Sequence, residues 1–206
     1  MCLRHPIRIL FVLLILMIAV PVSSPAQDGG QEVRSYLQGK MDAVFSVLKN
    51  PALNQEQKNG QIVEIVSPMF DFPLMTGLAF GKKHWGGMTR DQKVQFNDLF
   101  VKLLKKSFIE KLVQYTDEKV TIKDVVQKKN KVAVSTVLIS QGKAFDMGYK
   151  FYHSDKGWKI YDLEVQNISV ISTYRSQIDD VLKTGTYEEL MIKLEKPDED
   201  ASGKTK

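Results

Sequence analysis

Residues 120–166 decide the fold, and they read VTIKDVVQKKNKVAVSTVLISQGKAFDMGYKFYHSDKGWKIYDLEVQ. Apolar and polar side chains alternate along most of this stretch, which is the pattern of half-buried β-strands. Short polar connections such as Gln141-Gly142 predict tight turns, so successive strands should pair antiparallel as a meander. The four predicted strands span 120–127, 131–140, 143–153 and 157–166.

The third predicted strand carries unusually large side chains on one face. The residues that share this face are Phe145, Met147, Tyr149 and Phe151. In the fourth strand, Trp158 and Ile160 also lie on one face. These side chains either fill an ordinary core or line a core that is held open around a ligand, and periodicity does not separate the two.

Helical periodicity flanks the strands on both sides. Thr89 and Gln92 have the spacing of a capping box and open the longest predicted helix. Thr186 and Glu189 have the same spacing and predict a short final helix that ends before Pro197. The other predicted helical segments span 32–49, 54–66, 69–80, as one short helix or two turns, and 168–185.

The N-terminus predicts an export signal. Arg4 and Arg8 precede an unbroken apolar run over 9–20, which suits a signal peptide with about 7–15 apolar residues better than a spanning helix with roughly 20. The small residues of Ser24-Pro25-Ala26 predict cleavage after Ala26, with an uncleaved membrane anchor as the alternative. The predicted parts are a signal peptide over 1–26, a single domain over 27–197 and a polar tail over 198–206.

Cleavage at this position would alter both the thiol content and the charge. It removes Cys2, the only cysteine, so the hydrophobic core must hold the fold without a disulfide. It also leaves 27 basic against 24 acidic residues, a net charge of +3 instead of +5. Nucleic-acid-binding domains concentrate far more positive charge, so no nucleic-acid partner is expected.

Motifs for catalysis are missing from the sequence. It has no Gly-x-Ser-x-Gly motif and no phosphate-binding glycine loop, and neither His84 nor His153 has a second metal-ligand residue at a typical spacing. Adjacent acids such as Asp179-Asp180 point apart on a helix. We therefore expect a protein that is not an enzyme and has no cofactor or metal, although acids from distant segments could still form a pair.

Several segments, taken in order, resemble the MlaC family of periplasmic phospholipid-binding proteins, also described as toluene-tolerance auxiliary proteins. The segments that carry the resemblance are FDFPLMTGLAFG over 70–81, then Trp85, Thr89, Gln92, Phe96 and Phe100, then GWKIYDL over 157–163, Ile168-Ser169 and YRSQ over 174–177. Two positions depart from the family pattern: Asn167 often corresponds to Gly and Phe108 to Tyr.

The resemblance implies an α+β fold of the cystatin-like or nuclear-transport-factor-like kind, in which a curved four-stranded antiparallel sheet packs with five to six helices around an apolar lipid cavity. It also implies a periplasmic monomer that shuttles phospholipid between an outer-membrane lipoprotein complex and the MCE-domain ring of an inner-membrane ABC transporter, in support of outer-membrane lipid asymmetry. The phospholipid acyl chains would lie between the helices and the sheet.

The predicted lipid contacts combine the large apolar residues of these segments with one cation. They are Phe72, Leu74, Leu78, Phe96, Phe100, Leu103, Phe108, Val134, Phe145, Met147, Tyr149, Phe151, Trp158, Ile160 and Arg175. Arg175 is the predicted phosphate contact, with a structural ion pair to Asp162 as the alternative. Lys102, Lys105 and Lys106 either face an acidic patch on a membrane partner or are simply solvated.

Three other functions stay open at this point. The cargo could be another apolar molecule, such as a hopanoid-like lipid or a toxic organic solvent. The chain could also be an enzyme-like small-ligand domain with the same curved sheet, or an envelope interaction protein with no transport role.

Overall fold

The structure is a computed structural model, and it describes residues 29–112, 119–140 and 142–195. The predicted signal peptide over 1–26 and the predicted tail over 198–206 lie outside these ranges. Within them, no helix combines the length and the apolar character that crossing a bilayer requires.

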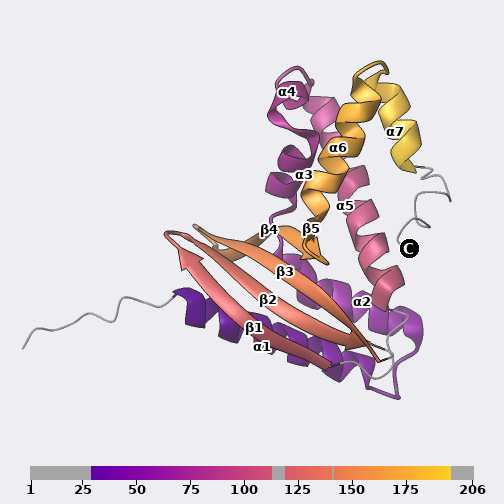
Figure 1. Ribbon diagram of the computed structural model, residues 1–206. Coiled ribbons are helices and arrows are strands. Elements are labelled where there is room, and N and C mark those ends of the chain that lie inside the picture. Colours follow the sequence, from indigo (N-terminus) through magenta and orange to yellow (C-terminus); the bar gives the residue numbers. More distant parts are fainter. Residues whose placement is uncertain (1–28, 113–118, 141, 196–206) are drawn as a thin grey trace, which may run out of the picture.

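One antiparallel sheet forms the centre of the chain (Figure 1), and its strands follow each other in sequence order. The strands are β1 (Lys119–Lys128), β2 (Lys131–Ser140), β3 (Lys143–Ser154), β4 (Gly157–Val165) and β5 (Ile168–Ser169). The predicted meander of four strands is confirmed, and the structure adds a short fifth strand.

The fifth strand results from a turn that the sequence prediction missed. Gln166 and Asn167 both have positive φ angles, 51° and 62°, which is the backbone of a tight hairpin turn. The chain therefore folds back, and Ile168 pairs with Val165 before the next helix begins. Ile168 is consequently 59% exposed in a strand, where the helical pattern had placed it on a buried helix face.

The described residues form seven α-helices and one 3-10 helix, slightly more than the five to six predicted. They are α1 (Gly29–Leu48), α2 (Gln55–Val66), η1 (Ser67–Met69), α3 (Phe72–Phe80), α4 (Lys82–Trp85), α5 (Arg90–Leu112), α6 (Val170–Leu182) and α7 (Tyr187–Glu195). The unpredicted α4 is a single turn that follows Gly81, whose φ of 82° suits glycine.

Capping boxes explain where α5 and α7 begin. At the start of α5, Gln92 N–H donates to the Thr89 hydroxyl over 3.2 Å, and Thr89 N–H donates to the Gln92 side chain over 3.0 Å. Thr186 and Glu189 make the same reciprocal pair before α7, at 3.2 and 2.8 Å. Both predicted boxes are confirmed, because this motif depends only on local spacing.

Two hydrophobic cores organise the molecule. The first core lies between α1 and one face of the sheet, which we call the inner face, and includes Val33, Leu37 and Phe151. The second core joins α3, α5, α6 and α7 around Phe80. In Figure 1, α1 runs along the strands, whereas the helices of the second core gather beyond the β4–β5 edge. Phe70 packs against both cores and so links them.

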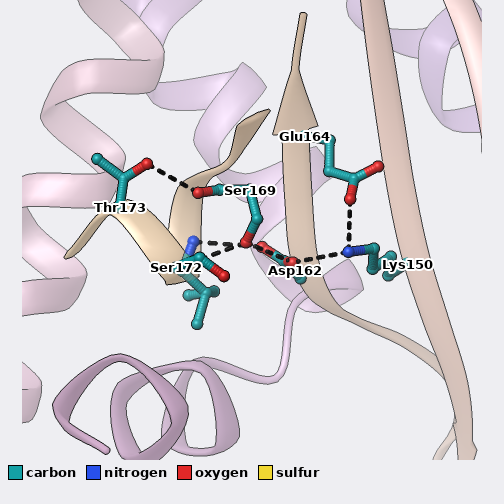
Figure 2. A network of polar contacts seen from close by, with 7 residues as sticks. Lys150, Asp162, Glu164, Ser169, Ser172 and Thr173 are labelled. Atoms are coloured by element: carbon teal, nitrogen blue, oxygen red, sulfur yellow. Dashed lines mark hydrogen bonds and ion pairs between the residues drawn. The ribbon is translucent and has the colours of Figure 1, made fainter. Parts of the chain in front are cut away.

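A polar network on the opposite, outer face anchors α6 to the sheet (Figure 2). The buried Asp162 carboxylate accepts hydrogen bonds from the Ser169 hydroxyl over 2.8 Å and from Ile171 N–H over 3.2 Å. It also pairs with Lys150, which bridges to Glu164. Asp162 and the N-cap Ser169 thus satisfy free amides of the first turn of α6.

Candidate functional site

Most inner-face residues of β2 and β3 are apolar, but their burial changes along the strands. Near α1, Val132, Val134 and Phe151 are almost fully buried. Further along β2 and β3, the inner-face side chains other than the buried Thr136 are only half-buried. We call these half-buried side chains the apolar extension: Leu138, Phe145, Met147 and Tyr149.

Strand register explains why these residues share one face. Leu138 pairs with Phe145, Thr136 with Met147, and Val134 with Tyr149, and directly paired residues project to the same side of a sheet. The apolar extension is therefore one continuous surface made by two neighbouring strands. It confirms that Phe145, Met147, Tyr149 and Phe151 lie on one face, as their spacing predicted.

A bulge in β4 changes which of its residues face inward. Phe151 pairs with Ile160 and Lys150 with Asp162, so Tyr161 is an extra residue. Such a bulge bends the strand and interrupts its alternation. Ile160 and Leu163 both reach the inner face because of it, while Asp162 reaches the outer network. The register also shifts between Ile122 and Val125 of β1, so two strands contribute irregularities that bend the sheet.

The predicted lipid contacts do not form a single group in the structure. In the first core lie Val134, Phe151, Trp158 and Ile160, with Tyr149 packed against it. In the second core lie Phe96 and Phe100, with Phe72, Leu78 and Leu103 packed against it. Half-buried or partly exposed, and in neither core, lie Leu74, Phe108, Phe145 and Met147.

Aromatic contacts show what Phe96 and Phe100 do. The ring of Phe96 meets Phe80 edge-on with centroids 4.7 Å apart and stacks on Phe100 at 5.6 Å. Phe100 in turn meets Tyr174 of α6 at 5.0 Å. Both phenylalanines are fully buried. Their contacts hold α3, α5 and α6 together as packed core.

The start of α3 carries a more exposed apolar edge. Phe72 stacks on Phe70 with centroids 5.5 Å apart, and Leu74 is 37% exposed. The ammonium of Lys105 from α5 lies 5.4 Å from the centre of the Phe72 ring, a cation–π contact. Lys106 instead forms an ion pair with Glu110, at 3.7 Å. Among the three lysines predicted to face a partner, Lys105 thus contacts one of the predicted lipid contacts, Phe72.

Thr136 is a polar residue on the inner face that the sequence analysis missed. It is 1% exposed, and its hydroxyl has no hydrogen-bond partner among the described residues. It pairs with Ile122 on one side and Met147 on the other. A buried hydroxyl without a partner costs roughly 1–3 kcal/mol. The signal was available, because 132, 134, 136 and 138 alternate as Val, Val, Thr and Leu.

Arg175 does not pair with Asp162. Its guanidinium donates through Nε over 2.8 Å and through a terminal nitrogen to the carbonyl of Leu78, in the last turn of α3. The Asp162 carboxylate already binds Lys150, Ser169 and the Ile171 amide. The alternative ion pair is therefore wrong, and the predicted phosphate contact of Arg175 stays a prediction.

Two hollows of the described surface lie away from the apolar extension. One of about 370 Å³ lies between the start of α3 and the β3–β4 turn, and its lining includes Asp71, Asp155 and Lys156. The other, of about 580 Å³, lies between α5 and α7. Neither contains one of the predicted lipid contacts.

The backbone conformation of Asn167 explains one of the two departures from the MlaC pattern. Its φ of 62° lies in the left-handed region, which glycine adopts freely and asparagine tolerates better than most residues. Asparagine can therefore stand where the family often has glycine. The second departure, Phe108, is half-buried on α5.

Comparison with known proteins gives matches for both the sequence and the fold. The chain is similar over 78% of its length to the solved phospholipid-binding protein from Ralstonia solanacearum in complex with a phospholipid. That match has 26% sequence identity, a TM-score of 0.69 and 93% coverage of the other chain. A de novo designed protein with a curved β-sheet also matches, at 15% identity and a TM-score of 0.26, over 30% of this chain and 59% of its own.

No curated protein matches the sequence. The family model described as MlaC protein matches residues 38–196. This range runs from the middle of α1 to the end of α7. The curved antiparallel sheet and the helices around it agree with the fold that the resemblance implied. The chain is therefore a member of the MlaC family.

Proposed function

We propose that this protein is a periplasmic carrier that binds phospholipid and shuttles it between the two membranes of the envelope. The observation that carries the proposal is the likeness to a phospholipid-binding protein solved with its lipid, at 26% identity and across 93% of that chain. Membership of the MlaC family supports the same role.

The energetics of lipid transfer define what such a carrier must supply. A diacyl lipid exposes about 30 methylenes to water at roughly 0.8 kcal/mol each, a gross cost on the order of 20 kcal/mol. A protein surface about as apolar as the bilayer offsets this cost and makes the transfer nearly balanced. The carrier then needs no nucleotide site, and direction comes from its partners.

We assign the acyl chains to the apolar extension, together with Phe108 and Leu74 of the helices. These side chains are large and apolar, yet they are half-buried or partly exposed, and all except Tyr149, which packs against the first core, lie outside the two packed cores. The unpartnered hydroxyl of Thr136 borders the extension at Met147. Phe96 and Phe151 are excluded from the assignment, because they are fully buried in the two cores.

The proposed partners follow from the family. The carrier would receive or deliver lipid at an outer-membrane lipoprotein complex and at the MCE-domain ring of an inner-membrane ABC transporter. It would act as a monomer, without catalysis. The cleaved signal predicted from the N-terminal sequence would take it to the periplasm.

Native mass spectrometry of the purified mature protein, followed by lipid extraction, tests the proposal. We expect a bound phospholipid, and uptake of labelled phospholipid from vesicles after the bound lipid is removed. A hopanoid-like lipid in the extract would instead identify the alternative cargo. A protein that carries no lipid and takes none up would contradict the carrier role. The alternative of an envelope interaction protein with no transport role would then be favoured.

The double substitution Phe145→Asp plus Met147→Asp tests the location of the lipid. Two carboxylates on the apolar extension should abolish lipid loading, because acyl chains cannot solvate them. The matched control is Val126→Asp plus Ile139→Asp, which places two carboxylates on exposed apolar positions, 51% and 41% exposed, of neighbouring strands. Normal loading in a folded Phe145/Met147 variant would show that the extension is ordinary core.

A further inference from the structure

A groove between α5 and α7 combines an apolar floor with an acidic rim. The floor is formed by Leu99, Met191 and Ile192, and the rim by Asp98, Glu188 and Glu195. Its volume is about 580 Å³. It contains none of the residues that we assign to lipid.

The floor exists because α7 is apolar on two sides. Leu190 and Leu194 are buried in the second core, whereas Ile192 is 61% exposed. On α5, Val94 is 54% exposed and lies one helical turn before Asp98, on the same side of the helix. Exposed apolar residues gathered on adjacent helices and bordered by polar ones mark an interaction surface.

The charge of the rim identifies the partner chemistry. Among the described residues, no lysine or arginine forms an ion pair with Asp98, Glu188 or Glu195. The chain as a whole carries a net charge of +5, so this acidic rim opposes the overall charge. A groove with this pattern complements an amphipathic helix that has apolar residues on one face and lysine or arginine beside them.

We propose that the α5–α7 groove binds one basic amphipathic helix of another protein. The apolar stripe of that helix would lie on Leu99, Met191 and Ile192, and its cations would face the three carboxylates. The inference does not depend on lipid binding, because the groove and the apolar extension share no residue.

Other occupants fit less well. The chain's own residues 196–206 read KPDEDASGKTK and contain no large apolar side chain to cover the floor. An anionic bilayer surface would be repelled by the carboxylates. A second copy, bound through the same groove by two-fold symmetry, would bring carboxylates against carboxylates.

The test uses two labelled model peptides of about 16 residues, each an amphipathic helix with one leucine face. One peptide carries lysine on its polar face and the other carries glutamate. We expect the mature protein to bind the lysine peptide, measured by fluorescence anisotropy, and to bind it more weakly as salt increases. Amide shifts in NMR spectra should be concentrated in α5 and α7.

The substitution Ile192→Lys should weaken binding of the lysine peptide by at least tenfold, because it places a cation on the exposed floor. Val126→Lys, at a 51% exposed position of β1, is the matched control and should bind as the unmodified protein does. Glu195→Lys provides a second variant on the rim. Circular dichroism checks that all three fold.

The proposal fails if Ile192→Lys and Glu195→Lys bind the lysine peptide with unchanged affinity, or if the glutamate peptide binds equally well. It also fails if the unmodified protein forms a dimer that Ile192→Lys dissociates, since the occupant would then be a second copy. Lipid loading, measured on the same samples, reports separately on the carrier function.

Discussion

At the scale of single residues, Tyr152 and Asp71 join β3 to the beginning of α3. The Tyr152 hydroxyl donates a hydrogen bond to the Asp71 carboxylate, which also accepts from Leu74 N–H as the N-cap of α3. Asp71 N–H donates to the carbonyl of Ile160 in β4. One aspartate therefore positions the helix that carries Phe72 and Leu74 against two strands.

The hydrogen bond to Asp71, with smaller contributions from burial and nearby negative charge, raises the pKa of Tyr152 from 10.0 to about 12. The stability gained from this contact is complete below pH 10, where tyrosine is neutral in both folded and unfolded chains, and is lost as the pH rises towards 12. Tyr152→Phe should therefore remove part of the decrease in melting temperature between pH 10 and pH 12.

Thermal unfolding followed by circular dichroism at several pH values measures this effect. Tyr161→Phe is the matched control, because its ring lies 6.1 Å from that of Tyr152. An unchanged pH dependence in Tyr152→Phe would contradict the assigned role of the contact.

At the scale of elements, the start of α6 depends on the outer-face network. Asp162 accepts three hydrogen bonds, from Ser169, Ile171 and Lys150, and its side chain is 9% exposed. Lys150 comes from β3 and Ile171 from α6, so the network attaches a helix of the second core to the sheet (Figure 2).

Asp162→Ala should lower the free energy of unfolding by about 2–4 kcal/mol, because it removes a cap and leaves buried donors without an acceptor. Glu164→Gln is the matched control: Glu164 binds the same lysine but is 30% exposed, and its loss should cost about 1 kcal/mol or less. Urea unfolding measures both. Equal losses in the two variants would show that the helix cap is not what Asp162 contributes.

At the scale of the whole molecule, two cores meet at Phe70, and Leu138, Phe145 and Met147 of the apolar extension belong to neither. Without a ligand, this surface exposes large apolar side chains to water. If lipid covers it, lipid binding should stabilise the folded chain as any ligand of the native state does.

Removal of bound lipid should therefore lower the melting temperature. A ligand present at about 100 times its Kd stabilises by about 2.7 kcal/mol, which corresponds to roughly 5–10 °C for a domain of this size. Differential scanning calorimetry of lipid-loaded and delipidated protein measures the shift, and added phospholipid should restore it. Equal melting temperatures would indicate that lipid does not bind the native state.

The sequence by itself determined most of the secondary structure and much of the topology. The four long strands, the capping boxes of α5 and α7 and the shared face of Phe145, Met147, Tyr149 and Phe151 all follow from local spacing, because alternation and capping depend on neighbours in the chain. The motifs around residues 70–81 and 157–163 were also enough to indicate the MlaC family.

The tertiary structure alone decided which apolar residues are packed and which stay partly open. Phe100 and Phe145 have equally apolar patterns, yet Phe100 is fully buried by α3 and α6 while Phe145 is only half-buried. The bulge at Tyr161 places Asp162 on the outer face of the sheet. Arg175 does not form an ion pair with Asp162, because its guanidinium binds the Leu78 carbonyl. Burial and pairing depend on elements that are distant in sequence, and periodicity specifies a face without specifying what covers it.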